Sequence, residues 1–206
     1  MGSIMALLGE NLGVYYKKDQ WIFKNMNIKV LPGQVLGLSG YSGCGKTTLA
    51  RVLAGYILPQ TGRVSVDSKP LAPKSFRPVQ LIYQHPEKAI NPRWKMEDVL
   101  TETYTPSQDI LDAFGIREDW RKRWPIELSG GELQRFCIVR ALNPQTRYII
   151  ADEMTTMLDA ITQARIWHSF LHICQSRKIG VIVVSHELSL LNRLCDKVIQ
   201  VGNTWE

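Results

Sequence analysis

The stretch "LGLSGYSGCGKTTLARVLAG", residues 36–55, organises this 206-residue chain. An apolar run ends there in glycine-rich sequence, and a helical pattern begins after Gly45-Lys46-Thr47. The segment 40–47 matches G-x-x-x-x-G-K-[ST] in full, after an expected strand and before an expected helix. In such a loop the backbone N–H groups and the N-terminus of the following helix face a polyanion. The stretch therefore predicts a site for the phosphates of a nucleotide.

The residues of this loop have separate expected tasks. Its glycines allow the backbone to approach the phosphates closely. Lys46 is expected to place a positive charge on the terminal phosphates, and Thr47 to offer its hydroxyl to Mg²⁺. The guanine-reading pattern N-K-x-D is absent from the sequence, so ATP is favoured over GTP. The predicted nucleotide-binding residues of the loop are Gly40, Ser42, Gly43, Cys44, Gly45, Lys46, Thr47 and Thr48.

A second part of the phosphate site is expected at the end of another strand. The sequence "YIIADE", residues 148–153, brings Asp152 and Glu153 to the end of an apolar run. Ligands of open α/β sheets bind at the carboxyl ends of the strands. We therefore expect Asp152 to hold Mg²⁺ or its water, and Glu153 to act as the general base for the attacking water.

Outward from these two motifs, apolar strands alternate with helical patterns. Strands are expected within 12–16, 22–30, 34–40, 61–67, 79–83, 147–152, 180–186 and 197–201. Helical sequence is expected at 45–55, from 95 to 142, at 160–177 and at 187–195. Such alternation predicts an α/β fold with a mostly parallel sheet that helices cover on both faces.

Composition narrows the class of protein. Hydrophobic residues make up 45% and charged residues 21% of the chain, as in ordinary globular proteins. No apolar run approaches the roughly 20 residues that span a bilayer, so a cytoplasmic chain without its own membrane segment is expected. The net charge of +6 is scattered, and acidic residues flank the basic group 121–123, so no nucleic-acid partner is expected. The four cysteines lack metal-type spacing and are expected to be reduced thiols.

The segment "ELSGGELQR", residues 127–135, has the local pattern of a helix start. Ser129 followed by Glu132 fits a capping box, and the two glycines between them allow a close approach to another molecule. Taken alone, this is an ordinary helix start. A second interpretation of this segment comes from the other motifs, among which it stands at a characteristic place along the chain.

The motifs, in their order, make the chain strongly resemble the ATP-binding subunits of ABC transporters over nearly its whole length. Between the phosphate loop and the acidic strand end lie Gln84, at the position of the family's Q-loop, and 128–132, which looks like the family's signature. After them come 157–159, which resembles the D-loop, and His186, which matches the switch histidine. Several ordered motifs at family spacing are far more specific than any one of them.

The resemblance implies a fold and a domain organisation. The fold is a P-loop NTPase of the ABC type, with a mostly parallel core sheet, an N-terminal antiparallel β subdomain and an inserted helical subdomain. The chain would be a single ABC ATPase domain over 1–206. Residues from about 1 to 94 and 145 to 206 would form the catalytic core with the β subdomain, and about 95 to 144 the helical subdomain with the signature.

The resemblance also implies how the motifs work together. Two ATP-binding subunits, identical or related, would pair head to tail, so that the signature of one closes on the phosphates held by the loop of the other. Gln84 would sense the metal and the attacking water, and His186 would hold the γ-phosphate. The remaining implied nucleotide contacts are Ser129, Gly130, Gly131, Glu132 and Asp159.

An aromatic residue that stacks on adenine is expected upstream of the loop. Tyr16 is the first candidate and Tyr15 the second. Neighbouring residues of a strand point to opposite faces, so only one of the two side chains can reach the base. An edge-strand tyrosine without a ligand is the alternative for Tyr16.

Within the family, "YQHPEKAINPRW", residues 83–94, looks most like the oligopeptide and nickel import group. By this resemblance the chain would work on two integral membrane permease subunits at the cytoplasmic face of the cell membrane, with an extracytoplasmic substrate-binding protein. Residues 83–94 would form part of the surface that contacts the permease, with Trp94 as an apolar contact. The cargo would be oligopeptides, nickel or metal chelates.

Two residues depart from the family pattern. Glu132 stands where glutamine is usual, and Met154 stands where proline usually follows the catalytic glutamate, which predicts a looser turn. Because of these departures, an ATP clamp that hydrolyses weakly as half of a heterodimer is one alternative function. An ABC-type ATPase acting on nucleic acid or ribosomes is another, although repair members would need a long coiled coil between the loop and the signature.

His168 and His172 have the i, i+4 spacing that can bind a metal ion on a helix. No glutamate precedes the second histidine as in H-E-x-x-H. Apolar residues surround the pair, so a partly buried helix face without a metal is the interpretation here.

Overall fold

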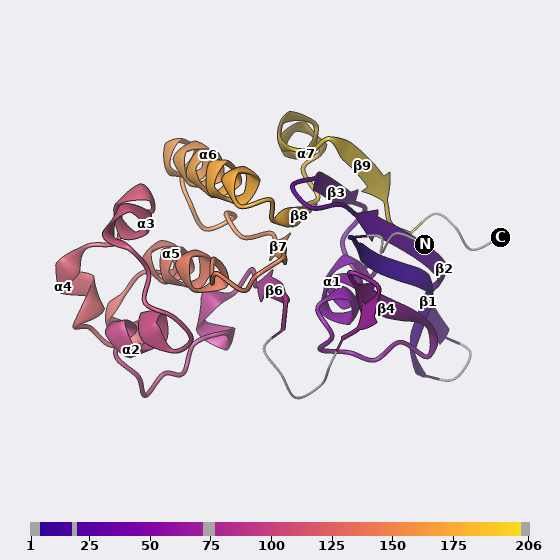
Figure 1. The fold of residues 1–206 in the computed structure, drawn as a ribbon, viewed down its shortest axis with the longest axis horizontal. Coiled ribbons are helices and arrows are strands. Elements are labelled where there is room, and N and C mark those ends of the chain that lie inside the picture. The colour runs from indigo at the N-terminus through magenta and orange to yellow at the C-terminus, as the bar shows by residue number, and fades with distance from the viewer. Residues whose placement is uncertain (1–4, 18–19, 72–76, 203–206) are drawn as a thin grey trace.

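The computed structural model describes residues 5–17, 20–71 and 77–202. Among these residues, no helix is both long and apolar enough to cross a membrane. The chain forms two sheets and a set of helices, and Figure 1 shows α2 to α5 at the opposite end of the molecule from β1 and β2.

The first sheet is antiparallel and has the strand order β2-β1-β4-β5. Its strands are β1 (Leu7–Lys17), β2 (Gln20–Val30), β4 (Thr61–Val66) and β5 (Lys69–Pro70). The predicted N-terminal antiparallel strands are thus present.

The second sheet contains the strands that lead to the phosphate loop and to the acidic residues Asp152 and Glu153. Its strand order is β6-β7-β8-β3-β9, and all four pairings along it are parallel. Its strands are β3 (Val35–Ser39), β6 (Val79–Ile82), β7 (Tyr148–Asp152), β8 (Gly180–Val184) and β9 (Lys197–Gln200). This sheet, with the antiparallel sheet and the helices, confirms the expected α/β fold.

The helices lie around this parallel sheet. The phosphate loop leads into α1 (Lys46–Leu53), and the C-terminal part of the chain supplies α6 (Ala160–Ser176) and α7 (Leu188–Leu194). Between β6 and β7 the chain forms short helices that gather on one side of the molecule in Figure 1. They are η1 (Pro86–Lys88), α2 (Met96–Thr101), α3 (Gln108–Ala113), α4 (Glu118–Arg121), η2 (Pro125–Glu127) and α5 (Gly130–Ala141).

The parallel sheet separates two hydrophobic cores. In β7, Ile149 and Ala151 belong to the core shared with α5 and α6, whereas Tyr148 and Ile150 belong to the core shared with α1 and the antiparallel sheet. Successive side chains of a strand point to opposite faces, so a strand that is covered on both faces is apolar throughout. This is why "YIIAD" shows no alternation of apolar and polar residues and is fully buried.

Candidate functional site

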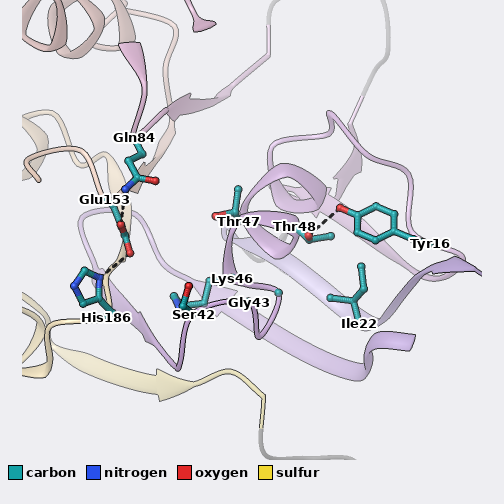
Figure 2. A pocket seen from close by; sticks show the side chains of 11 residues that line it. Tyr16, Ile22, Ser42, Gly43, Lys46, Thr47, Thr48, Gln84, Glu153 and His186 are labelled. Carbon is teal, nitrogen blue, oxygen red and sulfur yellow. Dashed lines mark hydrogen bonds and ion pairs between the residues drawn. The ribbon is translucent and has the colours of Figure 1, made fainter. Parts of the chain in front are cut away.

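The site lies at the carboxyl edge of the parallel sheet, where four neighbouring strands end. Gln84 follows β6, Glu153 follows β7, His186 follows β8, and the phosphate loop follows β3. The strand order β6-β7-β8-β3 makes these segments neighbours in space. A cavity of about 760 Å³ opens between them, and Figure 2 shows the side chains that line it. Its lining residues are Tyr16, Ile22, Ser42, Gly43, Gly45, Lys46, Thr47, Thr48, Gln84, Glu153 and His186.

The phosphate loop needs its glycines for space and for backbone conformation. Gly45 is the N-cap of α1 and has φ 99°, in the left-handed region that disfavours a side chain. A Cβ atom at Gly45 would lie 2.6 Å from Cγ2 of Ile22, and a Cβ at Gly40 would lie 2.6 Å from the carbonyl oxygen of Val201. The sequence pattern thus reflects a loop backbone packed against β2 on one side and against the residue that follows β9 on the other.

Lys46 is held inside the loop. Its side chain is 7% exposed, and its Nζ donates hydrogen bonds to the carbonyl oxygens of Gly40 at 2.8 Å and Tyr41 at 2.9 Å. A buried ammonium group is stable only when it is hydrogen-bonded. The loop's own carbonyls therefore hold this charge at the wall of the cavity.

Cys44 takes a different position from its neighbours in the loop. Its side chain is buried, with Sγ 3.9 Å from Nζ of Lys46, and its backbone N–H donates to the carbonyl of Tyr41 at 3.3 Å. Cys44 and Gly40 therefore support the loop from behind and do not line the cavity.

Tyr16 lies at the far end of the cavity from Glu153 (Figure 2). It is 71% exposed, and its hydroxyl lies 3.2 Å from Oγ1 of Thr48. Tyr15 instead packs edge-on against Trp21, with 5.0 Å between the ring centroids. The alternation of the strand therefore directs Tyr16 and not Tyr15 to the cavity. Sequence reasoning missed Ile22, although its place on β2 beside the expected tyrosine strand could have indicated it.

Glu153 lies between two polar side chains at the other end of the cavity. Oε2 accepts a hydrogen bond from Nε2 of Gln84 at 2.8 Å, and Oε1 lies 2.9 Å from Nδ1 of His186. Figure 2 shows the three side chains converging from separate segments. Glu153 also has φ 48°, which is uncommon for a residue other than glycine and clusters at functional sites.

Asp152 is buried behind the cavity, with 4% of its surface exposed. Burial raises the pKa of its carboxyl group, and a hydrogen bond with the Thr47 side chain opposes that rise. Asp152 and Thr47 are therefore neighbours, as the sequence pattern predicts. A buried carboxylate beside a hydroxyl is a donor set of hard oxygens that suits Mg²⁺.

The structure does not bring the signature-like segment to this cavity. Ser129 is the N-cap of α5, where its Oγ accepts from the N–H of Glu132 at 3.3 Å and the Glu132 carboxylate accepts from the N–H of Ser129 at 2.7 Å. The predicted capping box is present. Gly130, Gly131 and Asp159 also lie outside the cavity lining.

Asp159 begins another helix. Its Oδ1 accepts from the N–H groups of Ile161 at 3.1 Å and Thr162 at 2.9 Å, so it caps α6. Upstream of it, Met154 is buried at 2% exposure, and the hydroxyl of Thr155 accepts from Nε1 of Trp167 at 3.1 Å. The turn after Glu153 is thus packed against the core, and the looser turn expected without proline stays a prediction.

The His168 and His172 rings stack on α6, with 6.5 Å between centroids and 3° between planes. Both residues are exposed, so the expected partly buried face is wrong. Within 5–17, 20–71 and 77–202, no group of three or more histidine, cysteine, aspartate or glutamate side chains could hold a metal ion.

Comparison with known proteins shows the family of the chain. The family described as ABC transporter matches residues 23–156. A protein of Staphylococcus aureus (strain bovine RF122 / ET3-1) named nickel import system ATP-binding protein NikE is 34% identical, over 89% of this chain and 81% of its own length. The corresponding protein of strain MSSA476 is 33% identical over the same shares.

Solved structures agree. The chain is similar to the ATP-binding subunit of an ABC transporter, with a TM-score of 0.83 and 23% identity over 97% of this chain and 87% of that one. It is also similar to the ATP-binding cassette MJ0796, solved as a dimer with ADP and Pi, with a TM-score of 0.81 and 23% identity over 95% and 94% of the two chains. The chain therefore belongs to the ABC transporter family and shares the fold of an ATP-binding subunit of such a transporter.

Proposed function

We propose that this chain is the ATP-hydrolysing subunit of an ABC importer. The observation that carries the proposal is the placement of Glu153. Its carboxylate contacts Gln84 and His186 beside the cavity that Lys46 and the phosphate loop line. A carboxylate held at one end of a phosphate-binding cavity is suited to activate a water molecule for attack on the terminal phosphate.

ATP would bind along the cavity from Tyr16 to Glu153. The adenine ring would stack on Tyr16 with Ile22 beside it, and the phosphates would lie on the loop N–H groups and on Nζ of Lys46. Thr47, Asp152 and Gln84 are the side chains that would hold Mg²⁺ or its water. When bound, this ion would neutralise charge that develops on the phosphates.

The hydrogen bonds of Glu153 suggest how proton transfer is arranged. A carboxylate can only accept, so the Nδ1 that faces Glu153 carries a hydrogen of His186. Nε2 would donate to the γ-phosphate only in the imidazolium form, which carries a hydrogen on both ring nitrogens. Gln84 donates through its nitrogen, so its oxygen, which is turned away from Glu153 in Figure 2, is free for the metal or the attacking water. Glu153 would then take the proton of that water.

The second half of the site would come from another chain. Ser129, Gly130, Gly131 and Glu132 lie outside the cavity, yet they form a capped helix N-terminus that suits a phosphate. We propose a head-to-tail dimer, with itself or with a related subunit, in which this segment and Asp159 close over the nucleotide of the partner. In this proposal α2 to α5 form a helical subdomain within a single domain.

The importer assignment rests on the relatives and on residues 83–94. The relatives named above are nickel import proteins by name. By analogy we propose two integral membrane permeases and an extracytoplasmic binding protein as partners, at the cytoplasmic face of the cell membrane. Nickel, metal chelates or oligopeptides would be the cargo. Trp94, which is 37% exposed, is available as an apolar contact for a permease.

The alternative functions are less well supported. A silent ATP clamp would not need the hydrogen-bonded placement of Glu153 and His186. An ATPase that acts on DNA in repair would need a long coiled coil between loop and signature. The helices described between Lys46 and Ser129 are instead short, at most eight residues.

The substitution Glu153→Gln tests the proposed chemistry. It keeps the shape of the side chain and removes the base, so MgATP turnover should fall at least about 100-fold while nucleotide affinity is retained. Glu187→Gln, which changes an exposed carboxylate nearby, is the matched control and should retain turnover. Equal hydrolysis by Glu153→Gln and wild type would remove Glu153 from this role.

The importer assignment has its own test. The tagged protein would be isolated from gently solubilised membranes of its native host and its partners identified by mass spectrometry. Two integral membrane proteins in the preparation would support the importer. Recovery with ribosomes or DNA alone would overturn it and leave the ATPase proposal in place.

A further inference from the structure

Gln134 is a polar residue in the core that the proposed chemistry does not use. It lies on α5 and is 1% exposed. Its Nε2 donates a hydrogen bond to the carbonyl oxygen of Tyr83 at 3.1 Å, and its Oε1 is buried without a hydrogen-bond partner among the described residues. Buried polar atoms are nearly always paired, so an amide that leaves one atom unpaired requires an explanation.

The carbonyl that Gln134 holds is adjacent to the proposed site. Tyr83 immediately precedes Gln84, whose side chain donates to Glu153 at 2.8 Å. One turn further along α5, on the same face, Sγ of Cys137 lies 3.9 Å from the carbonyl oxygen of Pro86. Burial raises the pKa of the Cys137 thiol to about 11, so it remains an S–H donor at neutral pH. The helix thus contacts the backbone on both sides of Gln84.

The same helix begins at the signature. Ser129 caps α5 (Gly130–Ala141), and Gln134 lies within the second turn of the same helix. A rigid α-helix moves as a unit, so displacement at its first turn displaces the groups that contact Tyr83 and Pro86. The series from Ser129 through α5, Gln134, Tyr83 and Gln84 to Glu153 is a continuous set of covalent and hydrogen-bonded contacts.

We propose that Gln134 is a positioning residue that connects the signature helix to Gln84 and, through Gln84, to Glu153. This inference rests on the proposed ATPase function. Engagement of Ser129 by a phosphate on another chain would fix α5, and Gln134 would then fix the backbone at Tyr83 and with it the Gln84 side chain. Turnover would therefore depend on Gln134, although Gln134 contacts neither ATP nor the attacking water.

The substitution Gln134→Met removes the hydrogen bond and nearly conserves the volume. Loss of one positioning hydrogen bond should lower kcat for MgATP about tenfold. The KM for ATP should change by less than about twofold, because Gln134 does not line the cavity. Asn143→Leu is the matched control, since Asn143 is a 3% exposed amide whose Nδ2 bonds to Thr103, away from Gln84. It should lose thermal stability and keep kcat.

A double substitution separates positioning from mere stability. If Gln134 acts through Gln84, then Gln134→Met should add less than about a twofold loss in a Gln84→Ala background. Another full tenfold loss there, or a kcat that falls in step with stability in both Gln134→Met and Asn143→Leu, would overturn the proposal.

Hydrogen exchange gives a readout that does not require hydrolysis. Without nucleotide, the backbone of residues 83–88 should exchange faster in Gln134→Met than in wild type and stay unchanged in Asn143→Leu. Unchanged exchange in Gln134→Met would contradict the connection. If the wild-type chain proved unable to hydrolyse MgATP, the proposed function would fail, and the exchange result would still decide whether Gln134 holds this segment.

Discussion

Two helix N-termini in this chain have glycines beside them, and they differ in what they hold: Gly45 precedes α1, whereas Gly130 and Gly131 begin α5. At α1 the loop encloses the buried charge of Lys46 and forms the wall of a cavity. At α5, Ser129 and Glu132 form a capping box by reciprocal hydrogen bonds, and the exposed Ser129 does not line the cavity at α1. A helix N-terminus by itself is only a weak site for an anion. In the proposed function, α1 binds the nucleotide and α5 contributes only when another chain presents one.

Lys46→Ala should have the largest effect, since it removes the buried charge at the N-terminus of α1, where ATP is proposed to bind. It removes the charge from the cavity wall and also the hydrogen bonds that hold the carbonyls of Gly40 and Tyr41. The dissociation constant for ATP, measured by calorimetry, should rise about 100-fold or more, as expected for lost charge-assisted hydrogen bonds. Lys29→Ala, at an exposed position on β2, should bind ATP normally; similar losses in both variants would point to nonspecific electrostatics.

Ser129→Asp should abolish the proposed phosphate contact at the N-terminus of α5 without unfolding the helix. Aspartate caps a helix as well as serine does, but its charge would repel a phosphate presented by a partner chain. Turnover should fall by about 100-fold, the scale for losing a contact to developing phosphate charge, while Ser129→Asn remains active. ATP affinity of the isolated chain should not change.

A mixture of the two variants tests whether α1 of one chain and α5 of another form a single site. A dimer of one Lys46→Ala chain and one Ser129→Asp chain would contain one site with an intact loop and an intact signature. Turnover should therefore reappear on mixing two inactive preparations. Its absence, with dimers demonstrated by light scattering, would contradict a head-to-tail arrangement.

Tyr16→Ala tests the far end of the α1 cavity and should have a smaller effect. Loss of a stacking partner is worth roughly 1 kcal/mol, so ATP affinity should weaken about five- to tenfold. Tyr15→Ala is the control because Tyr15 contacts Trp21 instead of the cavity. It should lose stability and keep its affinity for ATP. Equal affinities in the two variants would remove Tyr16 from the site.

Asp152→Asn should have the smallest effect and should be stabilising. Burial raises the pKa of Asp152 in the folded chain above its usual 3.8, so its contribution to stability is fully present below that value and is lost as the pH rises through the folded pKa. With chelator present, asparagine should raise Tm at pH 7 by on the order of 2 °C, and the gain should shrink as the pH falls toward 4. Glu132→Gln, which can still complete the capping box, should show no such gain.

Much of the site could be predicted from the sequence because its residues occur in short local patterns. The loop from Gly40 to Thr47, the capping box at Ser129 and the carboxylates after "YIIA" are each defined within a few residues. Other features depend on distant contacts. Ile22 beside Tyr16, the packing of Met154 and the exposure of the stacked histidines on α6 have no local signal. The contact between Gln134 and Tyr83 joins residues 51 apart in the chain.

The phosphate loop, the order of strands and helices and the family could be read from the sequence, because local periodicity and motif spacing are sufficient for these. The tertiary structure decided which motifs meet. Gln84 and His186 lie 69 and 33 residues from Glu153 and reach it only because β6, β7 and β8 are neighbours in the sheet. The pairing of parallel strands is non-local, so no local pattern encodes it. For the same reason, the position of residues 129–131 outside the cavity lining is seen in the fold, whereas the sequence indicated it only through the family resemblance.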